Sequence, residues 1–599
     1  MAEQKKMYSM TWDLDVFFPG GSESPNFKMY IETLEKDIAS FDAALLHLTE
    51  QPSEDYDVWK GVLDQLQGLS RRLGEAGAFI SCLTAQDMKD AGAKMLRGRI
   101  SQMGAAYSAS LTKLDQLFLE MSNAGWENLL QDSRFAPIAF PLAERRRRAT
   151  DRLPADGESL AGDLAVDGYH AWGDMYNTIV GRMTIPFTEN GETKKLSIGQ
   201  AANKMHSTDR EVRQQVFHAM GKAWETEEDL LATTLNHLAG FRLNLYRHRG
   251  WDSPLKEPLD INRMSEKTLT TMWEVIDQNK GMLLKFFKRK AKILGVEKLA
   301  WYDVYAPISQ TESKVSYDEA AEFIIDQFKR FDPRLASFAE KAFRERWIEA
   351  EDRPGKRPGG FCTNFSDSSQ SRIFMTFAGT SSNISTLAHE LGHAYHQHVM
   401  NDLPQMAQRY AMNVAETAST FAELIVSDAA IREAKSKEEK INLLEDKIQR
   451  AVAFFMDIQA RFLFETRFYE ERKDGLVSSQ RLRELVVEAE KEAFQDSFTE
   501  YHPYFWASKL HFHITGVPFY NFPYTFGYLF STGLYGRALE AGPDFADRYV
   551  DLLRDTGRMT TEELAQKHLG VDLSRPEFWQ HAADLIHADI AHFLELTNE

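Results

Sequence analysis

The stretch between Pro404 and Gly475 contains neither glycine nor proline. Because these two residues most often end or kink a helix, the stretch has room for two or more long helices, and its later part is rich in phenylalanine. Apolar residues also recur at helical spacing between residues 26 and 123, for example at Val62 and Leu66. These patterns predict a mainly α-helical fold.

Two short segments break the helical pattern and predict β-hairpins. In "RMTIPFTENGET", Asn190 and Gly191 indicate a tight turn between two strands. The segments "FCTNF" (361–365) and "IFMTF" (373–377) predict two more strands, joined by the polar turn "SDSSQSR". This second hairpin leads into a helix for which residues 381–383, Ser-Ser-Asn, are suitable N-caps.

The length of the chain sets the expected number of structural units. Single cores stop growing beyond roughly 250–300 residues, so the 599 residues of this chain predict two to four domains or lobes. The change from helical to strand-like patterns places a division close to the first predicted hairpin. We therefore expect an N-terminal helical lobe over residues 1–190 and a second domain over residues 191–599.

Charge and cysteine content exclude several classes of protein. A formal net charge of -19 argues against nucleic-acid binding, which needs clustered lysine and arginine. The run Arg145–Arg148 is a local exception, and its acidic neighbours predict a solvated helical face.

Two cysteines exclude a disulfide framework and fit a reducing compartment. Without a signal-peptide pattern or an apolar run near the ~20 residues of a membrane span, we expect a cytoplasmic protein with no membrane partner.

The segment "LAHELGHAYHQH", residues 387–398, carries four of the 17 histidines of the chain. On a helix, His389 and His393 project from one face and can bind one metal ion in adjacent positions. Glu390 lies about 100° further around the helix, where it can contact a water on that ion without being a ligand. Metal-assisted hydrolysis needs this arrangement, and the alternative is a histidine-rich surface helix.

A catalytic zinc ion keeps three protein ligands and one open position, so a third ligand must come from elsewhere. A metzincin site would need a histidine where Val399 stands, six positions after His393. A thermolysin-like site would place a glutamate at about the positions of Met412 and Asn413. Neither subclass fits the sequence.

The acidic residues that follow the motif soonest are Asp402, Glu416 and Glu423. Asp402 stands in the turn-like "NDLP", where aspartate is ordinary. Glu416 and Glu423 lie seven positions apart on one helical face, so both are better candidates for the third ligand. His396 and His398 are expected at the surface or beside a ligand rather than on the metal.

A second dense region, "HFHITGVPFYNFPYTFGYLFSTGLY" (511–535), repeats tyrosine at every fourth position, at Tyr520, Tyr524 and Tyr528. Phenylalanine repeats at the same interval, and Pro523 suits the first turn of a helix. One stripe therefore carries hydroxyl groups while the other is apolar. The pattern fits either an aromatic core helix with tyrosines at its margin or a row of phenols that faces a site.

The segment "TLAHELGHAYH" followed by "NVAETASTFAE" resembles the oligoendopeptidase F branch of the thimet oligopeptidase family, a family of zinc metallopeptidases. The resemblance implies one zinc ion bound by His389, His393 and Glu416. Glu416 would be the glutamate of the family's E-x-x-S motif, and Ser419 matches the serine. Glu423 would then lie beside a ligand or pack against it.

The resemblance also assigns roles in the aromatic region. It implies that His513, Tyr520 and Tyr528 face the zinc and bind the substrate or the tetrahedral intermediate. Tyr524 and His511 are the reserve candidates for the same roles. The hairpin before the zinc-binding helix would offer an edge with which an extended peptide can pair.

The fold that the resemblance implies is a two-lobed, mainly α-helical metallopeptidase with a deep central channel and a small β-sheet next to the zinc-binding helix. Residues 191–599 would form the catalytic domain. The expected function is zinc-dependent endopeptidase action on short oligopeptides, with Glu390 as general base. An exopeptidase (a carboxypeptidase or a dipeptidyl carboxypeptidase) and an inactive peptide-binding protein are the alternatives. Oligopeptides are the expected partners, and the oligomeric state is left open.

Overall fold

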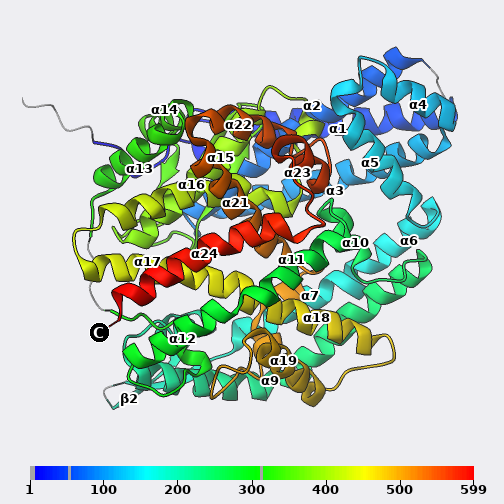
Figure 1. Ribbon diagram of the computed structural model, residues 1–599. Coiled ribbons are helices and arrows are strands. Elements are labelled where there is room, and N and C mark those ends of the chain that lie inside the picture. The colour runs from blue at the N-terminus through cyan, green and yellow to red at the C-terminus, as the bar shows by residue number, and fades with distance from the viewer. Residues whose placement is uncertain (1–6, 52–54, 190, 310–313, 599) are drawn as a thin grey trace, which may run out of the picture.

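The computed structural model describes residues 7–51, 55–189, 191–309 and 314–598. These residues form mostly α-helices, together with two small β-sheets (Figure 1). The prediction of a mainly α-helical fold is confirmed. None of the described helices combines the length and the apolar character that crossing a membrane requires.

Three long helices, α1 to α3, dominate the N-terminal part of the chain. Each begins at a capped residue, because the side chains of Ser24, Asp55 and Asp90 accept hydrogen bonds from backbone N–H groups in the first turn. Their apolar faces enclose a core that includes Phe27 and Phe79. The elements are η1 (Gly21–Glu23), α1 (Pro25–Glu50), α2 (Tyr56–Gln86), α3 (Ala91–Glu120), α4 (Asn123–Gln131), η2 (Ala136–Ile138) and α5 (Ala139–Thr150).

The arginine run on α5 is not the solvated face that the sequence predicts. Only Arg147 is classed as exposed. Arg145 forms an ion pair with Asp115 of α3, and Nε of Arg148 lies 2.6 Å from Oδ2 of Asp260. The prediction was wrong because α5 packs against α3. The side chains of Arg145 and Arg148 therefore pair with carboxylates of other elements instead of pointing into solvent.

The first predicted hairpin is present. Strands β1 (Ile185–Glu189) and β2 (Glu192–Leu196) pair antiparallel, with Glu189 opposite Glu192. Asn190 lies outside the described residues, and Gly191 has a φ of 80°, which glycine adopts at little cost. The surrounding helices are α6 (Ala155–Ala165), the π-helix η3 (Val166–His170), α7 (Ala171–Arg182), α8 (Ile198–Lys204), α9 (Arg210–His248), α10 (Lys256–Ile261), α11 (Glu266–Asn279) and α12 (Gly281–Ile293).

The second predicted hairpin is also present, within a three-stranded sheet of order β3-β5-β4. Strand β4 (Phe361–Phe365) pairs antiparallel with β5 (Gln370–Phe374), and β3 (Ile348–Glu349) runs parallel to β5. The second strand begins three residues earlier than predicted, because Phe365 pairs with Gln370 and the connection is correspondingly short. The elements before the sheet are η4 (Trp301–Asp303), α13 (Tyr317–Phe331) and α14 (Pro333–Arg344).

The N-cap of the helix after the sheet lies one residue before the predicted caps. Thr380 caps α15 by accepting a hydrogen bond from the Asn383 N–H, and the Asn383 side chain accepts one from the Thr380 N–H. The glycine- and proline-free stretch forms several helices, as predicted. The elements are α15 (Ser381–Met400), η5 (Gln405–Gln408), α16 (Met412–Glu433), α17 (Lys437–Val452), the π-helix η6 (Ala453–Asp457), α18 (Ile458–Arg472) and α19 (Ser479–Ala493).

The aromatic region contributes one long helix, α21, which has proline in its first turn and packs against both α16 and α24. It is almost entirely buried, so its phenylalanines belong to the main core. The C-terminal elements are α20 (Phe505–Ser508), η7 (Leu510–His513), α21 (Phe522–Ala541), η8 (Gly542–Asp544), α22 (Phe545–Asp555), α23 (Thr561–Leu569) and α24 (Pro576–Leu596).

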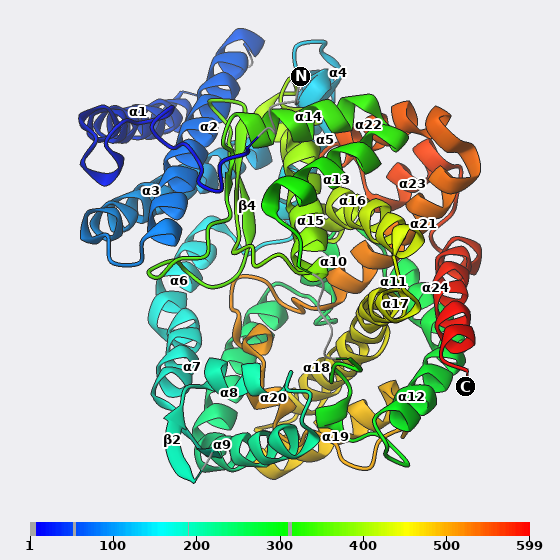
Figure 2. The ribbon, with the colours of Figure 1, turned by 90° about the vertical axis from the view of Figure 1, so that its left-hand side faces the viewer.

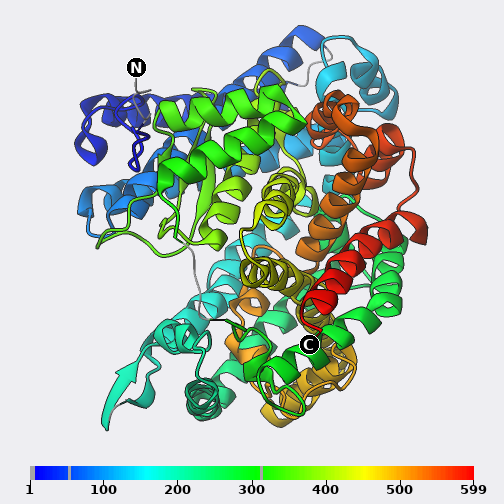
Figure 3. The same cartoon turned by 60° about the vertical axis from the view of Figure 1, so that its left-hand side comes forward.

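The helices fall into two groups, as the two-lobed prediction expects. In Figure 2, the N-terminal helices, the sheet with β4, and α13 to α16 lie above, whereas α7 to α9, α12 and α18 to α20 lie below. Figure 3 shows the hairpin of β1 and β2 projecting away from the helices. The apolar core divides at another place, since the N-terminal cluster ends at Leu142 apart from two phenylalanines of the sheet. The division near residue 190 stays a prediction.

Candidate metal centre

Two glycines allow three helices to meet at the segment His389–His393 of α15. A Cβ atom on Gly392 would lie 2.6 Å from Cα of Ser419 in α16, which no side chain tolerates. A Cβ atom on Gly527 in α21 would lie 2.9 Å from Cβ of Glu416. Glycine at both positions therefore lets α15 and α21 approach α16 from two sides.

This close approach brings together the side chains of His389, His393 and Glu416. One ligand-type atom of each lies within 4.8 Å of the others, and no other such group of three is found among the described residues. Oε2 of Glu416 lies 3.2 Å from Nε2 of His389 and 3.5 Å from Nε2 of His393. Two imidazole nitrogens and one carboxylate oxygen thus converge on one point.

The structure distinguishes the two glutamates that the sequence offers as the third metal ligand. Glu416 faces both imidazoles, and the hydroxyl of Ser419 donates to its Oε2 at 2.8 Å. Glu423 lies on the other side of His389, with Oε2 3.1 Å from Nδ1. Nη2 of Arg450 in α17 lies 2.7 Å from the second oxygen of Glu423. No local sequence pattern points to Arg450, because α17 approaches α16 only in the folded chain.

The protein environment shifts the pKa values of the three residues of the cluster in different directions. Burial opposes charge on His389, but hydrogen bonds to Glu416 and Glu423 outweigh it and raise its pKa to about 10. Burial lowers the pKa of His393 to about 4. Burial also opposes charge on Glu416, yet the hydrogen bond from His389 and the nearby imidazoles hold its pKa at about 2. The carboxylates on both sides of His389 therefore favour a cation at this point, and a metal ion would take the place of the proton on His389.

Glu390 lies beside the cluster without belonging to it. It is 7% exposed, and its Oε2 is buried without a hydrogen-bond partner among the described residues. Burial raises the pKa of this carboxyl to about 7. The donor set of two imidazoles and one carboxylate is that of a catalytic zinc site. The residues present therefore fit a zinc ion, with an adjacent carboxylate left to act on a water molecule.

A cavity of about 460 Å³ opens beside His389 and Glu416, and Tyr524 and Tyr528 of α21 line it. Tyr528 is only 4% exposed, and its ring stacks on Phe454 with the centroids 4.6 Å apart. Both phenols therefore stand at the wall of the cavity that contains the candidate ligands.

Tyr520 and His511 continue this wall. The hydroxyl oxygens of Tyr520 and Tyr524 lie 3.5 Å apart, and the ring centroid of His511 lies 5.4 Å from that of Tyr520. Burial lowers the pKa of His511 to about 4, so its imidazole is neutral at neutral pH. The predicted Tyr520 and the two reserve candidates, Tyr524 and His511, thus form a row that ends at the cavity, which the predicted Tyr528 also lines.

His513 is not brought to the cavity. It is 1% exposed, and its ring stacks on Tyr176 with the centroids 3.9 Å apart. His511 and His513 belong to the short 3₁₀-helix η7, where residues two apart project in different directions. The structure thus brings the reserve His511 toward the tyrosines and turns the preferred candidate away from them.

The two remaining motif histidines differ in environment. His398 is exposed, as expected. His396 is fully buried, stacks on Tyr410 at 4.2 Å and has Nε2 2.9 Å from Oγ1 of Thr556. It is therefore buried rather than at the surface, because the end of α15 packs against α22.

The sequence has relatives among known proteins. The sequence model of peptidase family M3 matches residues 203–585, and the model described as oligopeptidase F matches residues 118–185. An oligoendopeptidase F homolog of Lactococcus lactis is 25% identical over 90% of both chains. Oligopeptidase PepF of Bacillus subtilis is 21% identical over all of this chain and 90% of its own.

Solved structures share the fold. A Chlamydophila abortus protein aligns with a TM-score of 0.83 at 21% identity over 98% of both chains. Oligoendopeptidase F of Enterococcus faecium aligns with a TM-score of 0.71 at 18% identity, over 95% of this chain and 98% of its own. The resemblance inferred from the sequence motifs is thus confirmed, and the chain is a peptidase that belongs to peptidase family M3.

Proposed function

We propose that this chain is a zinc-dependent endopeptidase that hydrolyses internal peptide bonds of short oligopeptides. The observation that carries the proposal is the convergence of His389, His393 and Glu416, with the buried carboxylate of Glu390 beside them. The relatives that are named oligoendopeptidase F support the substrate class.

Each residue of the cluster has a distinct role in the proposed reaction. The two histidines and Glu416 would hold a zinc ion, which when bound would supply Lewis acidity toward the scissile carbonyl and would acidify a water molecule. Glu390 takes a proton from the attacking water and returns it to the leaving amine. The phenols of Tyr524 and Tyr528 can donate to the carbonyl oxygen as negative charge develops on it.

The edge of the small sheet suits an extended substrate. β4 lies at the edge of its sheet, and among the described residues no strand pairs with its outer side. Gly360 directly precedes β4, and a Cβ atom there would lie 3.5 Å from Oε1 of Glu390. A peptide that adds to β4 as a further strand would therefore bring a backbone carbonyl close to the general base. In this proposal the substrate reaches the strand through a channel between the two groups of helices.

The proposal is tested by metal analysis of the purified protein together with mass-spectrometric mapping of cleavage sites. The substrates are short peptides that are blocked at both termini, mixed with unblocked peptides of the same sequences. We expect about one zinc ion per chain and cleavage inside the blocked peptides. Cleavage of the unblocked peptides alone would show an exopeptidase instead. Zinc binding without hydrolysis of any peptide would contradict the proposal and favour the inactive peptide-binding alternative.

A further inference from the structure

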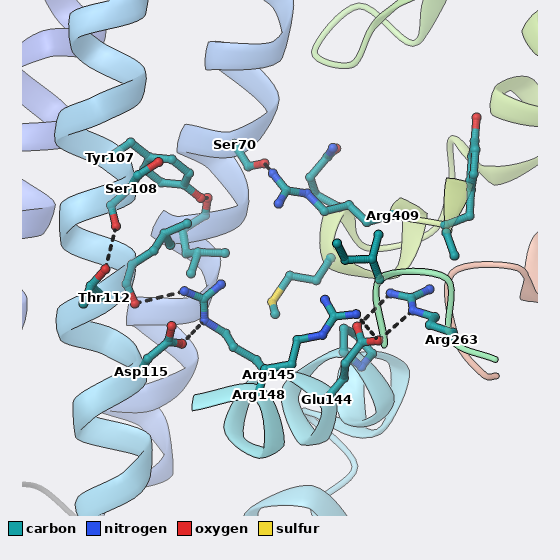
Figure 4. A pocket seen from close by; sticks show the side chains of 18 of the residues that line it. Ser70, Tyr107, Ser108, Thr112, Asp115, Glu144, Arg145, Arg148, Arg263 and Arg409 are labelled. Carbon is teal, nitrogen blue, oxygen red and sulfur yellow. Dashed lines mark hydrogen bonds and ion pairs between the residues drawn. The ribbon is translucent and has the colours of Figure 1, made fainter. Parts of the chain in front are cut away.

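A second cavity, of about 490 Å³, lies between the N-terminal helices and the segment that leads into α16. Helices α2, α3 and α5 form one side, while Arg263 and parts of residues 405–411 form the other (Figure 4). This cavity shares no lining residue with the cavity beside His389 and Glu416. The proposed peptidase reaction makes no use of it.

Positive charge dominates the lining of this second cavity. Five arginines but only two carboxylates line it, in a protein whose formal net charge is -19. Each carboxylate of the lining is shared between two arginines, and Arg148 is also paired with Asp260, which lies outside the lining. The groups are Asp115 with Arg145 and Arg152, and Glu144 with Arg148 and Arg263.

Arg409 is the cation that these carboxylates do not reach. Its guanidinium donates to the hydroxyl oxygen of Ser70 at 3.2 Å, and no ion pair joins it to an acidic residue among those the structure describes. Arg152 is also weakly paired, since its Nη1 lies 3.7 Å from Oδ2 of Asp115 and its side chain is 44% exposed. Two guanidinium groups are thus available to a ligand.

The arrangement of the remaining groups suits a small organic anion. Figure 4 shows the side chains of Arg145, Arg148 and Arg409 around one open space, with Tyr107 at its margin. Burial lowers the pKa of the Arg145 guanidinium, because water solvates this cation poorly. The lining also contains apolar side chains, among them Met406, which an organic group could contact.

We propose that this cavity binds a small organic anion through phosphate or carboxylate oxygens, with Arg409 and Arg152 as the main cationic contacts. Guanidinium groups bind both kinds of oxyanion through paired hydrogen bonds, and the volume falls in the range of small-molecule sites. The bound anion would connect the N-terminal helices to residues 405–411, directly before the helix that carries Glu416.

Isothermal titration of the full-length protein, at constant ionic strength, tests the proposal. The probes are phenyl phosphate and glutarate, which represent the phosphate and the carboxylate source. The variants Arg409→Gln and Arg152→Gln each remove one guanidinium from the cavity. Arg548→Gln is the matched control, because Arg548 is exposed on α22 and does not line the cavity.

We expect saturable binding of at least one probe to the wild type, and a Kd about tenfold higher in at least one of the two cavity variants. Arg548→Gln should bind like the wild type, and the tighter of the two probes identifies the source of the anion. The proposal is overturned if neither probe binds the wild type saturably at millimolar concentration. It is equally overturned if both cavity variants bind like the wild type, or if the control loses as much affinity as they do.

Discussion

Oε2 of Glu423 lies 3.1 Å from Nδ1 of His389, on the side of the ring opposite to Glu416. This contact fixes the orientation of the imidazole and favours the tautomer in which Nε2 is free to bind a metal. Arg450 holds Glu423 in turn, with Nη2 2.7 Å from Oε1. The contacts from Arg450 through Glu423 to His389 therefore orient the imidazole of one candidate metal ligand.

Glu423→Gln is expected to weaken zinc binding about 10- to 100-fold, because an amide orients and polarises the imidazole less well than a carboxylate. The protein should still fold, since glutamine has nearly the same size. Titration of the metal-free protein with zinc, in competition with a chelating dye, measures the change in Kd.

The control for this experiment is Glu433→Gln at the far end of the same helix, where the side chain is 46% exposed and lies 3.4 Å from Arg330. It should leave the zinc Kd unchanged. An unchanged zinc Kd in Glu423→Gln itself would mean that this carboxylate does not support the ligand.

Glu390→Gln should keep the zinc content of the wild type while lowering kcat by about 10²- to 10⁴-fold, the usual contribution of a general base. Glutamine cannot accept the proton of the attacking water, and Glu390 is not among the three converging ligand-type groups. Parallel measurements of bound zinc and of peptide turnover check both statements. Wild-type turnover in a zinc-loaded Glu390→Gln sample would remove this role from Glu390.

Gly392→Ala should lower both the melting temperature and the zinc affinity, because its Cβ would lie 2.6 Å from Cα of Ser419 and push α15 away from α16. Overpacking of this kind typically costs about 1–3 kcal/mol. Gly221→Ala in the middle of α9 is the matched control, since a Cβ there meets nothing within 4 Å. Thermal unfolding and zinc titration of both variants separate helix approach from a general effect of alanine. Equal behaviour of the two variants would contradict the packing argument.

The helices and both hairpins could be predicted because their signals are local. The caps, the spacing of apolar residues and the absence of glycine and proline act within a few turns. Strand β5 was misplaced by three residues because its position depends on pairing with β4, for example Phe365 with Gln370. The burial and pairing of the Arg145 side chain depend on Asp115 of another helix, and no local sequence pattern contains that information.

The same distinction between local signals and contacts of distant elements applies to the candidate site. The spacing of His389 and His393 within one helical turn is local, and the sequence therefore identifies both as potential ligands. The choice between His511 and His513 depends on the course of η7 and on packing against Tyr176. Arg450 was missed for the same reason, since it meets Glu423 only across two helices.

Glu465 of α18 supports the segment that carries the aromatic row. Its Oε1 accepts a hydrogen bond from the backbone N–H of Phe519 at 3.3 Å, directly before Tyr520. Phe519 has a φ of 51°, which is costly for an aromatic residue, so this contact helps to hold a strained backbone. Glu465 is 4% exposed, and burial raises its pKa to about 8 even though Arg242 is nearby.

The raised pKa of Glu465 predicts a loss of stability as the pH rises. Between its ordinary pKa near 4.5 and about 8, the folded protein keeps this proton while the unfolded chain has released it, so folding becomes less favourable at higher pH. The effect is on the order of a few kcal/mol. Glu465→Gln cannot ionise and should escape this loss, so its melting temperature should rise relative to the wild type from pH 5 to pH 8, by the sign of that linkage.

Glu470→Gln, on the same helix but 71% exposed, is the control for this comparison, and its melting temperature should follow that of the wild type at every pH. A difference between Glu465→Gln and the wild type that stays constant across the range would mean that Glu465 is ionised in the folded protein. The hydrogen bond from Phe519 would then be made to a carboxylate, and Arg242 rather than a proton would balance its charge.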